Sequence, residues 1–509
     1  MFRALRNLRR LARIGLTLAR YGALDDFDAA TTPRSVRVMT RLLKRRDLPD
    51  RPGQRLAAAL IALGPSFIKL GQALSTRADL VGAAVAAELS ALQDKLAPFP
   101  AADARTTIAA EFGAPVDALF TRFDDMPVAA ASIAQVHFAE TTEGRPVAVK
   151  VLRPGIEALF ARDIDLFLWL AAILERHVPR LRRLRPVAVV RSFAETVKIE
   201  MDLRLEAAAA AELAQNFADD PDFRVPTVDW ARTSRRVLTT GRIAGISVDE
   251  RSAIEAAGFE ARAVVGKAAR AFFNQVFRDG FFHADMHPGN LFVADDGALI
   301  AVDFGIMGRI DEPTRHALAD MLMGFLAGDY AQVAEAHFRA GFVPPSQSMG
   351  AFAQACRAIA EPILGKPLHE ISLARLLAQL FEVTEQFQME TQPQLLLLQK
   401  SMLVCEGVGR LLAPELNMWE LARPLIEEWM VEHRGPGARA RVVAEQALAR
   451  IEELPQFVDN LEKAAAMLAS GGVRLHPDSI AALSGGRSTR WWPWAVAVAA
   501  LAAAVVWLA

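Results

Sequence analysis

The stretch HADMHPGN, residues 283–290, is the most informative part of the sequence. The spacing of its polar side chains, together with Asp303 further on, suits phosphoryl transfer. Asn290 lies five residues after Asp285, and Asp303 follows in the string Val-Asp-Phe-Gly after one short predicted strand hairpin. Transfer of a phosphoryl group needs a residue that orients the nucleophile, and oxygen ligands for Mg²⁺. The joint spacing predicts Asp285 in the first role and Asn290 with Asp303 in the second.

Two histidines in the same stretch offer a different interpretation, a metal site. His283 and His287 are four residues apart, as in helical metal-binding pairs. Pro288 and Gly289 follow directly, and proline interrupts a helix. A stable helix that presents both imidazoles is therefore not expected, and phosphoryl transfer is favoured over a metal site or a simple turn.

A lysine upstream adds to this chemistry. Val-Ala-Val-Lys at 147–150 matches the strand motif whose lysine contacts the α- and β-phosphates of ATP. Residues 126–140 and 145–154 alternate and include β-branched side chains, with a Thr-Thr-Glu-Gly turn between them, which predicts a meander of short strands. The turn over the phosphates reads Ala-Ala-Ala-Ser at 129–132, and each Cβ restricts the approach of backbone amides to phosphate. ATP and Mg²⁺ are therefore the expected cofactors, with the nucleotide in a different pose from that in an ordinary kinase.

The motif lysine pairs with a glutamate on a following helix. The string EMDLRLEAAAAAEL, residues 200–213, offers Glu200, Asp202 and Glu206. The residues alone leave the choice among these three carboxylates open.

Net charge and the two termini bear on the partners. The 509 residues have a net charge of −1, so no global field favours nucleic acid. Residues 491–509 hold no charge and have tryptophans at both ends, which predicts a transmembrane helix. Arginines on one face of the first helix predict a helix on an anionic membrane surface or, equally well, a helix that packs on the protein's own body. Cys356 and Cys405 are far apart in apolar surroundings, which predicts buried thiols.

Several longer strings carry a family resemblance. They are FIKLGQALSTRADL (67–80), PVAAASIAQVH (127–137), VAVKVLRPG (147–155), EMDLRLEAA (200–208), FFHADMHPGN (281–290), VDFGIMGRI (302–310) and LLLLQKSMLVCEGVGRLLAPELNMWELARP (395–424). In this order the chain resembles the UbiB family of atypical, kinase-like proteins of ubiquinone biosynthesis. The resemblance runs from about residue 20 to residue 430.

The resemblance implies roles for individual residues. Lys150 would pair with Glu206 and contact ATP, and Asp285 would be the catalytic aspartate. The nucleotide loop would comprise Val128, Ala129, Ala130, Ala131, Ser132, Ile133, Ala134, Gln135 and Val136, and Asn290 and Asp303 would hold Mg²⁺. A regulatory motif of Lys69, Gly71 and Gln72 would fold over the site and occlude a peptide substrate, with Lys69 bridging to the acidic pair Glu200 and Asp202.

The expected fold is α+β and bilobal, like protein kinases, with a small β-rich N-lobe, a helical C-lobe, a helical N-terminal extension and a C-terminal transmembrane helix. The expected segments are a basic amphipathic membrane-surface helix (1–30), a helical extension with the Lys69 motif (31–110), the N-lobe (111–245), the C-lobe (246–430), a helical tail (431–486) and the anchor (491–509). The anchor would place the protein at a bacterial inner membrane, with the catalytic domain in the cytoplasm.

The expected function is a membrane-associated atypical kinase or ATPase that supports ubiquinone biosynthesis by acting on, or presenting, lipid-soluble quinone precursors. Two alternatives are a nucleotide-binding pseudokinase that serves as a scaffold for a biosynthetic complex, and a protein kinase. The expected partners are membrane lipid, quinone precursors, other ubiquinone-biosynthesis proteins and a second copy of the chain. Nucleic acid is not among them.

Overall fold

The computed structural model describes residues 2–23, 51–75, 96–178, 185–362, 393–416 and 423–430, with single residues or short pieces at 45–49, 85–92 and 379–389. The chain divides into two compact units, Met1–Met430 and Val431–Ala509. The second unit, which includes the predicted helical tail and the segment 491–509, lies outside the described residues. All described elements belong to the first unit.

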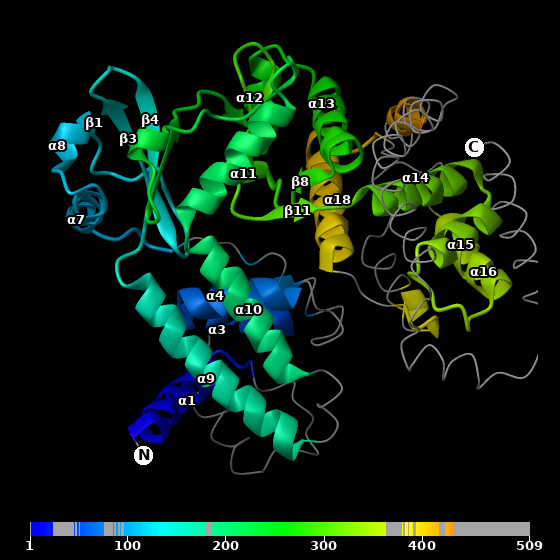
Figure 1. Ribbon diagram of the computed structural model, residues 1–509, viewed down its shortest axis with the longest axis horizontal. Helices are drawn as coiled ribbons and strands as arrows, with labels where there is room; N and C mark the ends of the chain where they lie inside the picture. Colours follow the sequence, from blue (N-terminus) through cyan, green and yellow to red (C-terminus); the bar gives the residue numbers. More distant parts are fainter. Residues whose placement is uncertain are drawn as a thin grey trace, which may run out of the picture. The chain divides into compact units, whose positions relative to one another are not determined.

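The first lobe is built on an antiparallel sheet (Figure 1). Its strands are β1 (Phe120–Phe123), β2 (Ala129–Ala130), β3 (Ala134–Thr141), β4 (Pro146–Leu152) and β6 (Val237–Gly241), in the order β1-β3-β4-β6 with β2 paired to β3. This confirms the meander predicted for residues 126–154. On β4, Val147, Val149 and Val151 are buried against the core under α7 (Ala101–Phe112) and α8 (Val116–Leu119). Because strand side chains alternate, Lys150 projects from the opposite face.

A group of helices packs beside this sheet. They are α1 (Phe2–Arg20), α3 (Pro52–Leu63), α4 (Pro65–Ser75), α9 (Ile156–His177), α10 (Pro186–Glu200) and α11 (Leu203–Asn216). Figure 1 shows α9 and α10 running beside each other with α3 and α4 against them. The rings of Phe67 on α4 and Phe167 on α9 meet edge to face with centroids 5.2 Å apart. Apolar side chains from these helices and from β3 and β4 form one continuous core.

The second lobe is mainly helical and contains the sheets that carry the opening stretch. Its helices are α12 (Arg251–Ala256), α13 (Ala261–Phe273), α14 (Glu312–Ala327), α15 (Tyr330–Arg339), α16 (Met349–Ala360) and α18 (Pro393–Leu412), with short helical turns at Asn274–Asp279 and Pro288–Asn290. One sheet has the order β5 (Phe223–Arg224), β10 (Leu299–Ala301), β9 (Leu291–Val293), β7 (Ile246–Ser247). A second sheet pairs β8 (Phe281–His283) with β11 (Met307–Arg309). A Cβ at Gly308 would lie 2.2 Å from the Phe282 ring, so β11 needs glycine at this position.

The structure corrects one part of the predicted fold class, the transmembrane helix. In the part of the chain that the structure describes, no helix is both long and apolar enough to cross a membrane. The longest helices there carry charges, such as Asp163 within α9 and Lys400 within α18, and a charge at the bilayer centre is costly. The predicted span 491–509 lies outside the described residues. A C-terminal anchor is therefore not supported, and neither is the inner-membrane localisation that was based on it.

The first helix packs on the protein's own body. Arg10 of α1 forms two hydrogen bonds to the fully buried carboxylate of Asp163 on α9, at 3.1 and 3.0 Å. Ile14 and Ala19 are buried in the same helix, whereas Leu8 and Leu16 are exposed. This arrangement matches the packing alternative from the sequence, and a role for α1 at a membrane surface stays a prediction.

Candidate active site

Three charged side chains from distant parts of the chain meet at the face of the first sheet. Lys150 lies on β4, opposite Val136 and Leu238 of the neighbouring strands. Its Nζ is 2.7 Å from Oε1 of Glu206 on α11 and 3.0 Å from Oδ1 of Asp303, which follows β10. Of the three carboxylates that the sequence offered, Glu206 is therefore the one that binds Lys150.

Electrostatics favour the charged forms of Lys150 and Asp303. Burial acts to lower the pKa of Lys150, but the charges of Asp303 and Glu206 outweigh it and hold that pKa above its ordinary value. Burial acts to raise the pKa of Asp303, but the charge and hydrogen bond of Lys150 hold it well below its usual range. Burial raises the pKa of Glu206, with Lys150 opposing the shift. Lys150 and Asp303 are therefore charged at neutral pH.

The backbone at Asp303 is strained. Its φ is 61°, in the left-handed region that aspartate tolerates better than most residues. Such strain persists only where the surroundings enforce it, and it concentrates at functional sites. The conformation brings the Asp303 carboxylate within hydrogen-bond distance of Lys150.

The catalytic-loop histidines hold the loop in shape. Nδ1 of His283 accepts the backbone N–H of Asp285 at 3.1 Å, so its Nε2 carries the proton and donates to the carbonyl of Val302 at 3.2 Å. Nδ1 of His287 accepts the N–H of Gly289 at 3.0 Å. His283 is fully buried, and burial lowers its pKa. Across the described ranges no cluster of three or more His, Cys, Asp or Glu is placed to hold a metal ion.

Asp285 and Asn290 are fixed by different partners. The amide nitrogen of Asn290 donates to the backbone carbonyl of Asp285 at 3.1 Å, which leaves the amide oxygen for another ligand. The carboxylate of Asp285 accepts a hydrogen bond from Nζ of Lys400 on α18 at 2.8 Å. An amide oxygen on Asn290 and a carboxylate on Asp303 are hard oxygen donors, the type that suits Mg²⁺. Because Mg²⁺ keeps waters and substrate oxygens in its shell, two protein ligands are sufficient.

The residues of the predicted nucleotide loop differ in their exposure. Val128 and Ala129 are exposed and Ala130 and Ala131 are half-buried, whereas Ser132, Ile133, Ala134 and Gln135 are buried. Ile133 belongs to the core with α4 and α9. The Gln135 amide both accepts from and donates to the backbone of Phe99, at 2.9 and 3.1 Å. The exposed and half-buried residues of the predicted loop are therefore 128–131 and Val136.

Arg153 ties this loop to the helical extension. Its guanidinium donates to the carbonyl of Ala131 at 3.1 and 2.8 Å and to that of Ala97 at 2.9 Å. Its charge also lies over the ring of Phe99, 5.5 Å from the centroid. These contacts hold the turn of the loop against residues 97–99 of the extension.

The Lys69 motif lies at the junction of α10 and α11. Nζ of Lys69 is 2.9 Å from Oε2 of Glu200, and both side chains are about one-tenth exposed. Asp202 caps α11 by accepting the backbone N–H of Arg204, and it forms an ion pair with the same arginine. The two members of the predicted acidic pair therefore have separate partners. Because Glu206 follows in α11, one helix junction contacts both Lys69 and Lys150.

Gly71 and Gln72 contact neighbouring leucines and not the charged side chains of the site. A Cβ at Gly71 would lie 2.7 Å from a methyl carbon of Leu60 and 2.8 Å from one of Leu92, so glycine permits close packing of α4 on α3. The amide of Gln72 donates to the carbonyl of Leu92 at 3.5 Å. In the motif, Lys69 is therefore the residue that reaches the acidic side chains of the site.

Three residues near the site were not singled out from the sequence. Lys400 contacts Asp285, and Arg153 binds the alanine-rich loop. Gln275 is fully buried and accepts the backbone N–H of His283. Lys400 had a visible signal, since it is the one charge between residues 393 and 405 of an otherwise apolar helix. Arg153 and Gln275 occupy ordinary positions after a strand and within a helical turn, where the sequence offers no signal.

Known proteins resemble this chain over most of its length. The sequence model of the ABC1 atypical kinase-like domain matches residues 91–337, and that of the UbiB helical domain matches residues 356–417. A Marinobacter nauticus protein described as "Probable protein kinase UbiB" is 41% identical over 474 residues, covering 92% of this chain and 86% of that protein. A protein of the same description from Aliivibrio salmonicida is 40% identical over 462 residues, covering 89% and 85%.

A solved structure shares the fold. It is Rv3197 from Mycobacterium tuberculosis, determined as a complex with erythromycin. The TM-score is 0.53 at 23% identity, and the match covers 77% of this chain and 98% of that one. Together with the ABC1 match, it supports the bilobal kinase-like architecture.

Proposed function

Because the chain belongs to the UbiB family of atypical kinase-like proteins, which implies a place in ubiquinone biosynthesis, we propose that it is an ATP-dependent phosphotransferase or ATPase. Mg-ATP would bind between the two lobes. The substrates or ligands would be lipid-soluble quinone precursors, which the protein acts on or presents to other enzymes of the pathway.

The observation that carries the proposal is the Lys150 group. A lysine bonded to a helix glutamate and to the aspartate of an Asp-Phe-Gly string is the arrangement that kinases need before they transfer phosphate. When ATP is bound, the Lys150 ammonium would bind phosphate oxygens. Glu206 would keep the lysine oriented, as its buried position and 2.7 Å contact allow.

Mg²⁺ fits the oxygen atoms that Asn290 and Asp303 offer, and when bound it would neutralise charge on the phosphates. Asp285 would orient the attacking hydroxyl or water and accept its proton. His283 supports this role indirectly, because its Nδ1 fixes the backbone N–H of Asp285. These residues supply positioning and charge, which is most of what phosphoryl transfer requires of a protein.

The Lys69–Glu200 contact favours a small acceptor over a peptide. Both side chains are nearly buried, and they join α4 to the end of α10. Breaking an ion pair that is largely withdrawn from water is costly, so α4 is held in place rather than resting loosely. A helix held there would restrict access for an extended peptide chain.

The proposal is tested by Mg²⁺-dependent ATP hydrolysis with and without a phenolic, quinone-like compound in liposomes. We expect turnover in the wild type, stimulation by the compound, and loss of turnover in Asp303→Asn. Asp219→Asn, an exposed aspartate on the surface after α11, is the matched control and should behave like the wild type.

Two outcomes would favour the alternatives. ATP binding without turnover under every condition would favour the pseudokinase scaffold. Rapid phosphorylation of generic peptides would favour a protein kinase and would contradict the closed arrangement of α4. Normal quinone levels in a strain that lacks the protein would contradict the pathway.

A further inference from the structure

Helix α18 brings a lysine to the carboxylate that the proposed chemistry depends on. Nζ of Lys400 is 2.8 Å from Oδ1 of Asp285, although the two residues are 115 positions apart in the chain. Their side chains are 27% and 29% exposed, so the pair opens toward solvent and not into the core. Lys400 lies within the residues 356–417 that match the UbiB helical domain.

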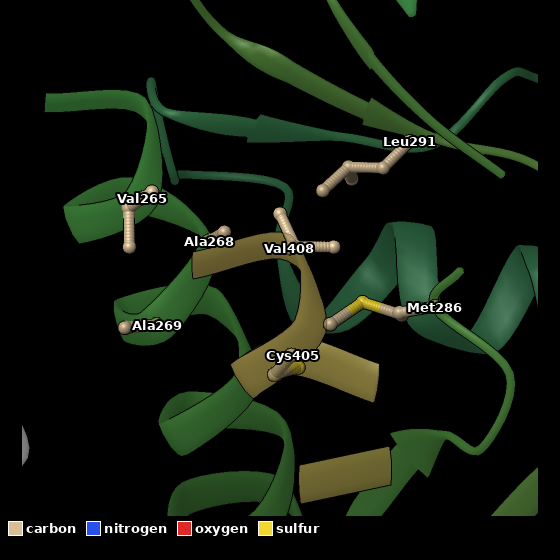
Figure 2. A pocket seen from close by; sticks show the side chains of 7 residues that line it. All are labelled: Val265, Ala268, Ala269, Met286, Leu291, Cys405 and Val408. Carbon is tan, nitrogen blue, oxygen red and sulfur yellow. The ribbon is translucent and has the colours of Figure 1, made fainter. Parts of the chain in front are cut away.

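Packing of α18 fixes where this lysine lies. Figure 2 shows Cys405 and Val408 of α18 directed toward Met286 and Leu291, the residues on either side of the short catalytic-loop turn. Burial raises the pKa of the Cys405 thiol to about 12, so it acts here as a neutral apolar group. Leu398 of α18 belongs to the same core cluster as Met286. The helix is therefore anchored next to Asp285 by apolar contacts on both sides of Lys400.

Stability is a weak reason for a charge at this position. An ion pair that is more than one-quarter exposed contributes roughly 0–1 kcal/mol, because water screens it and two side chains lose freedom. Every other residue between 393 and 405 is uncharged, and an apolar or neutral polar residue at 400 would fit the helix as well. The contact with Asp285, the proposed catalytic base, is a functional reason for the positive charge of Lys400.

The distances place Lys400 within reach of the reacting groups. A hydroxyl oriented by Asp285 lies within about 3 Å of its carboxylate, and the attacked phosphorus lies about 3–3.5 Å beyond. The ammonium already sits 2.8 Å from that carboxylate, on a flexible four-carbon side chain. A change in its side-chain torsions would bring the ammonium toward an oxygen of a phosphoryl group attacked next to Asp285, and lysine binds phosphate well as a point charge.

We propose that Lys400 is a further catalytic residue, supplied by the helical domain, which holds Asp285 in the resting site and binds an oxygen of the transferred phosphoryl group during reaction. In that step the acceptor oxygen bonds to the γ-phosphorus, and the bond from the γ-phosphorus to the β–γ bridging oxygen breaks. The bond electrons leave with ADP. The acceptor proton passes to Asp285 and then to solvent, while Lys400 keeps its own protons throughout. This role rests on the phosphotransfer function proposed above.

The test compares Lys400→Met, Lys400→Arg and the control Lys198→Met, an exposed lysine on α10. Fluorescent-nucleotide titration gives the nucleotide affinity, and Mg²⁺-dependent ATP hydrolysis gives the turnover. We expect Lys400→Met to lose about 100-fold in turnover, the scale of removing one group that stabilises the transition state. Nucleotide affinity should change less than about threefold, because most binding contacts remain. Lys400→Arg keeps the charge and should recover at least about tenfold over Lys400→Met.

A second comparison separates catalysis from structure. In an Asp285→Asn background, Lys400→Met should cost less than about threefold, because groups that act together are strongly non-additive. Equal losses in both backgrounds would overturn the proposal, as would Lys400→Met turnover within a few-fold of an active wild type. If Lys400→Met lowers nucleotide binding and turnover together, and Lys400→Arg does the same, the residue is structural and the proposal fails. A wild-type protein that binds nucleotide and never hydrolyses it would overturn the proposed function together with this role.

Discussion

Replacing Arg10 by methionine removes the guanidinium that binds a fully buried carboxylate, and we expect α1 to separate more often from the body of the protein. Asp163 lies in the middle of α9 with an exposed fraction of 0%. Two nitrogens of Arg10 bind its two oxygens, at 3.1 and 3.0 Å. Methionine keeps much of the arginine's apolar length but cannot donate a hydrogen bond.

The size of the effect follows from burial. Removing one partner of a buried ion pair costs roughly 3–5 kcal/mol, because the remaining charge loses its compensation. Arg10 is itself 19% exposed, so water can partly reach the carboxylate in the variant, and the lower end of about 3 kcal/mol is expected. Loss of the contact between Arg10 and the Phe67 ring, at 5.7 Å, adds a smaller amount. A change of about 3 kcal/mol raises the undocked population of α1 roughly 100-fold.

Amide hydrogen exchange followed by mass spectrometry measures that population in the peptide that spans α1. We expect exchange about 100-fold faster in Arg10→Met than in the wild type. Arg13→Met, on the exposed face of the same helix, is the matched control and should exchange like the wild type. Equal exchange rates in Arg10→Met and the wild type would show that the Arg10–Asp163 ion pair does not hold α1 in place. An equal acceleration in Arg13→Met would show the same.

Three further predictions concern the surroundings of the site. Glu200→Gln removes the ion pair to Lys69, and hydrogen exchange in α4 should accelerate at least about tenfold; unchanged exchange would show that the pair does not hold α4. Gly71→Ala places a methyl group 2.7 to 2.8 Å from two leucine side chains and should lower the free energy of unfolding by about 1–3 kcal/mol in urea, whereas Gly266→Ala, with open space in α13, should not lower it. Burial lowers the pKa of His283, so below about pH 6.5 the unfolded chain takes up a proton that the folded chain does not. Stability should therefore fall on acidification from about pH 6.5 toward the folded pKa, by up to about 1.4 kcal/mol per pH unit, and His283→Asn should show a shallower dependence in denaturant titrations; an identical slope would contradict this.

Local patterns predicted the strands and the order of the site residues well. The alternation at 126–154 corresponds to β2, β3 and β4, and the strand lysine does project from the face opposite the valine core. Alternation did not reveal which residues of the predicted nucleotide loop pack inward, because it does not show which side of a short turn packs on a neighbouring helix. Ile133 faces α4 and Gln135 binds Phe99, and both contacts depend on the helical extension.

The termini show where local patterns are least informative. A charged, amphipathic helix has the same sequence pattern whether it packs on a lipid surface or on another helix. In α1 the buried acid that receives Arg10 is 153 residues away, so the first helix alone cannot reveal it. The predicted membrane span was based on an uncharged run of sufficient length with tryptophans at both ends, and no described helix supports a spanning segment.

Spacing in the sequence predicted Asp285, Asn290 and Asp303 as one group, because they lie in short segments joined by a loop and a hairpin. The strand motif likewise predicted the position of Lys150. Which carboxylate binds Lys150 and which cation binds Asp285 depends on the tertiary structure. Those partners come from α11 and α18, 56 and 115 residues away. Contacts over such separations depend on how helices pack, and helix packing is set by the buried apolar faces of many residues together, not by any one motif.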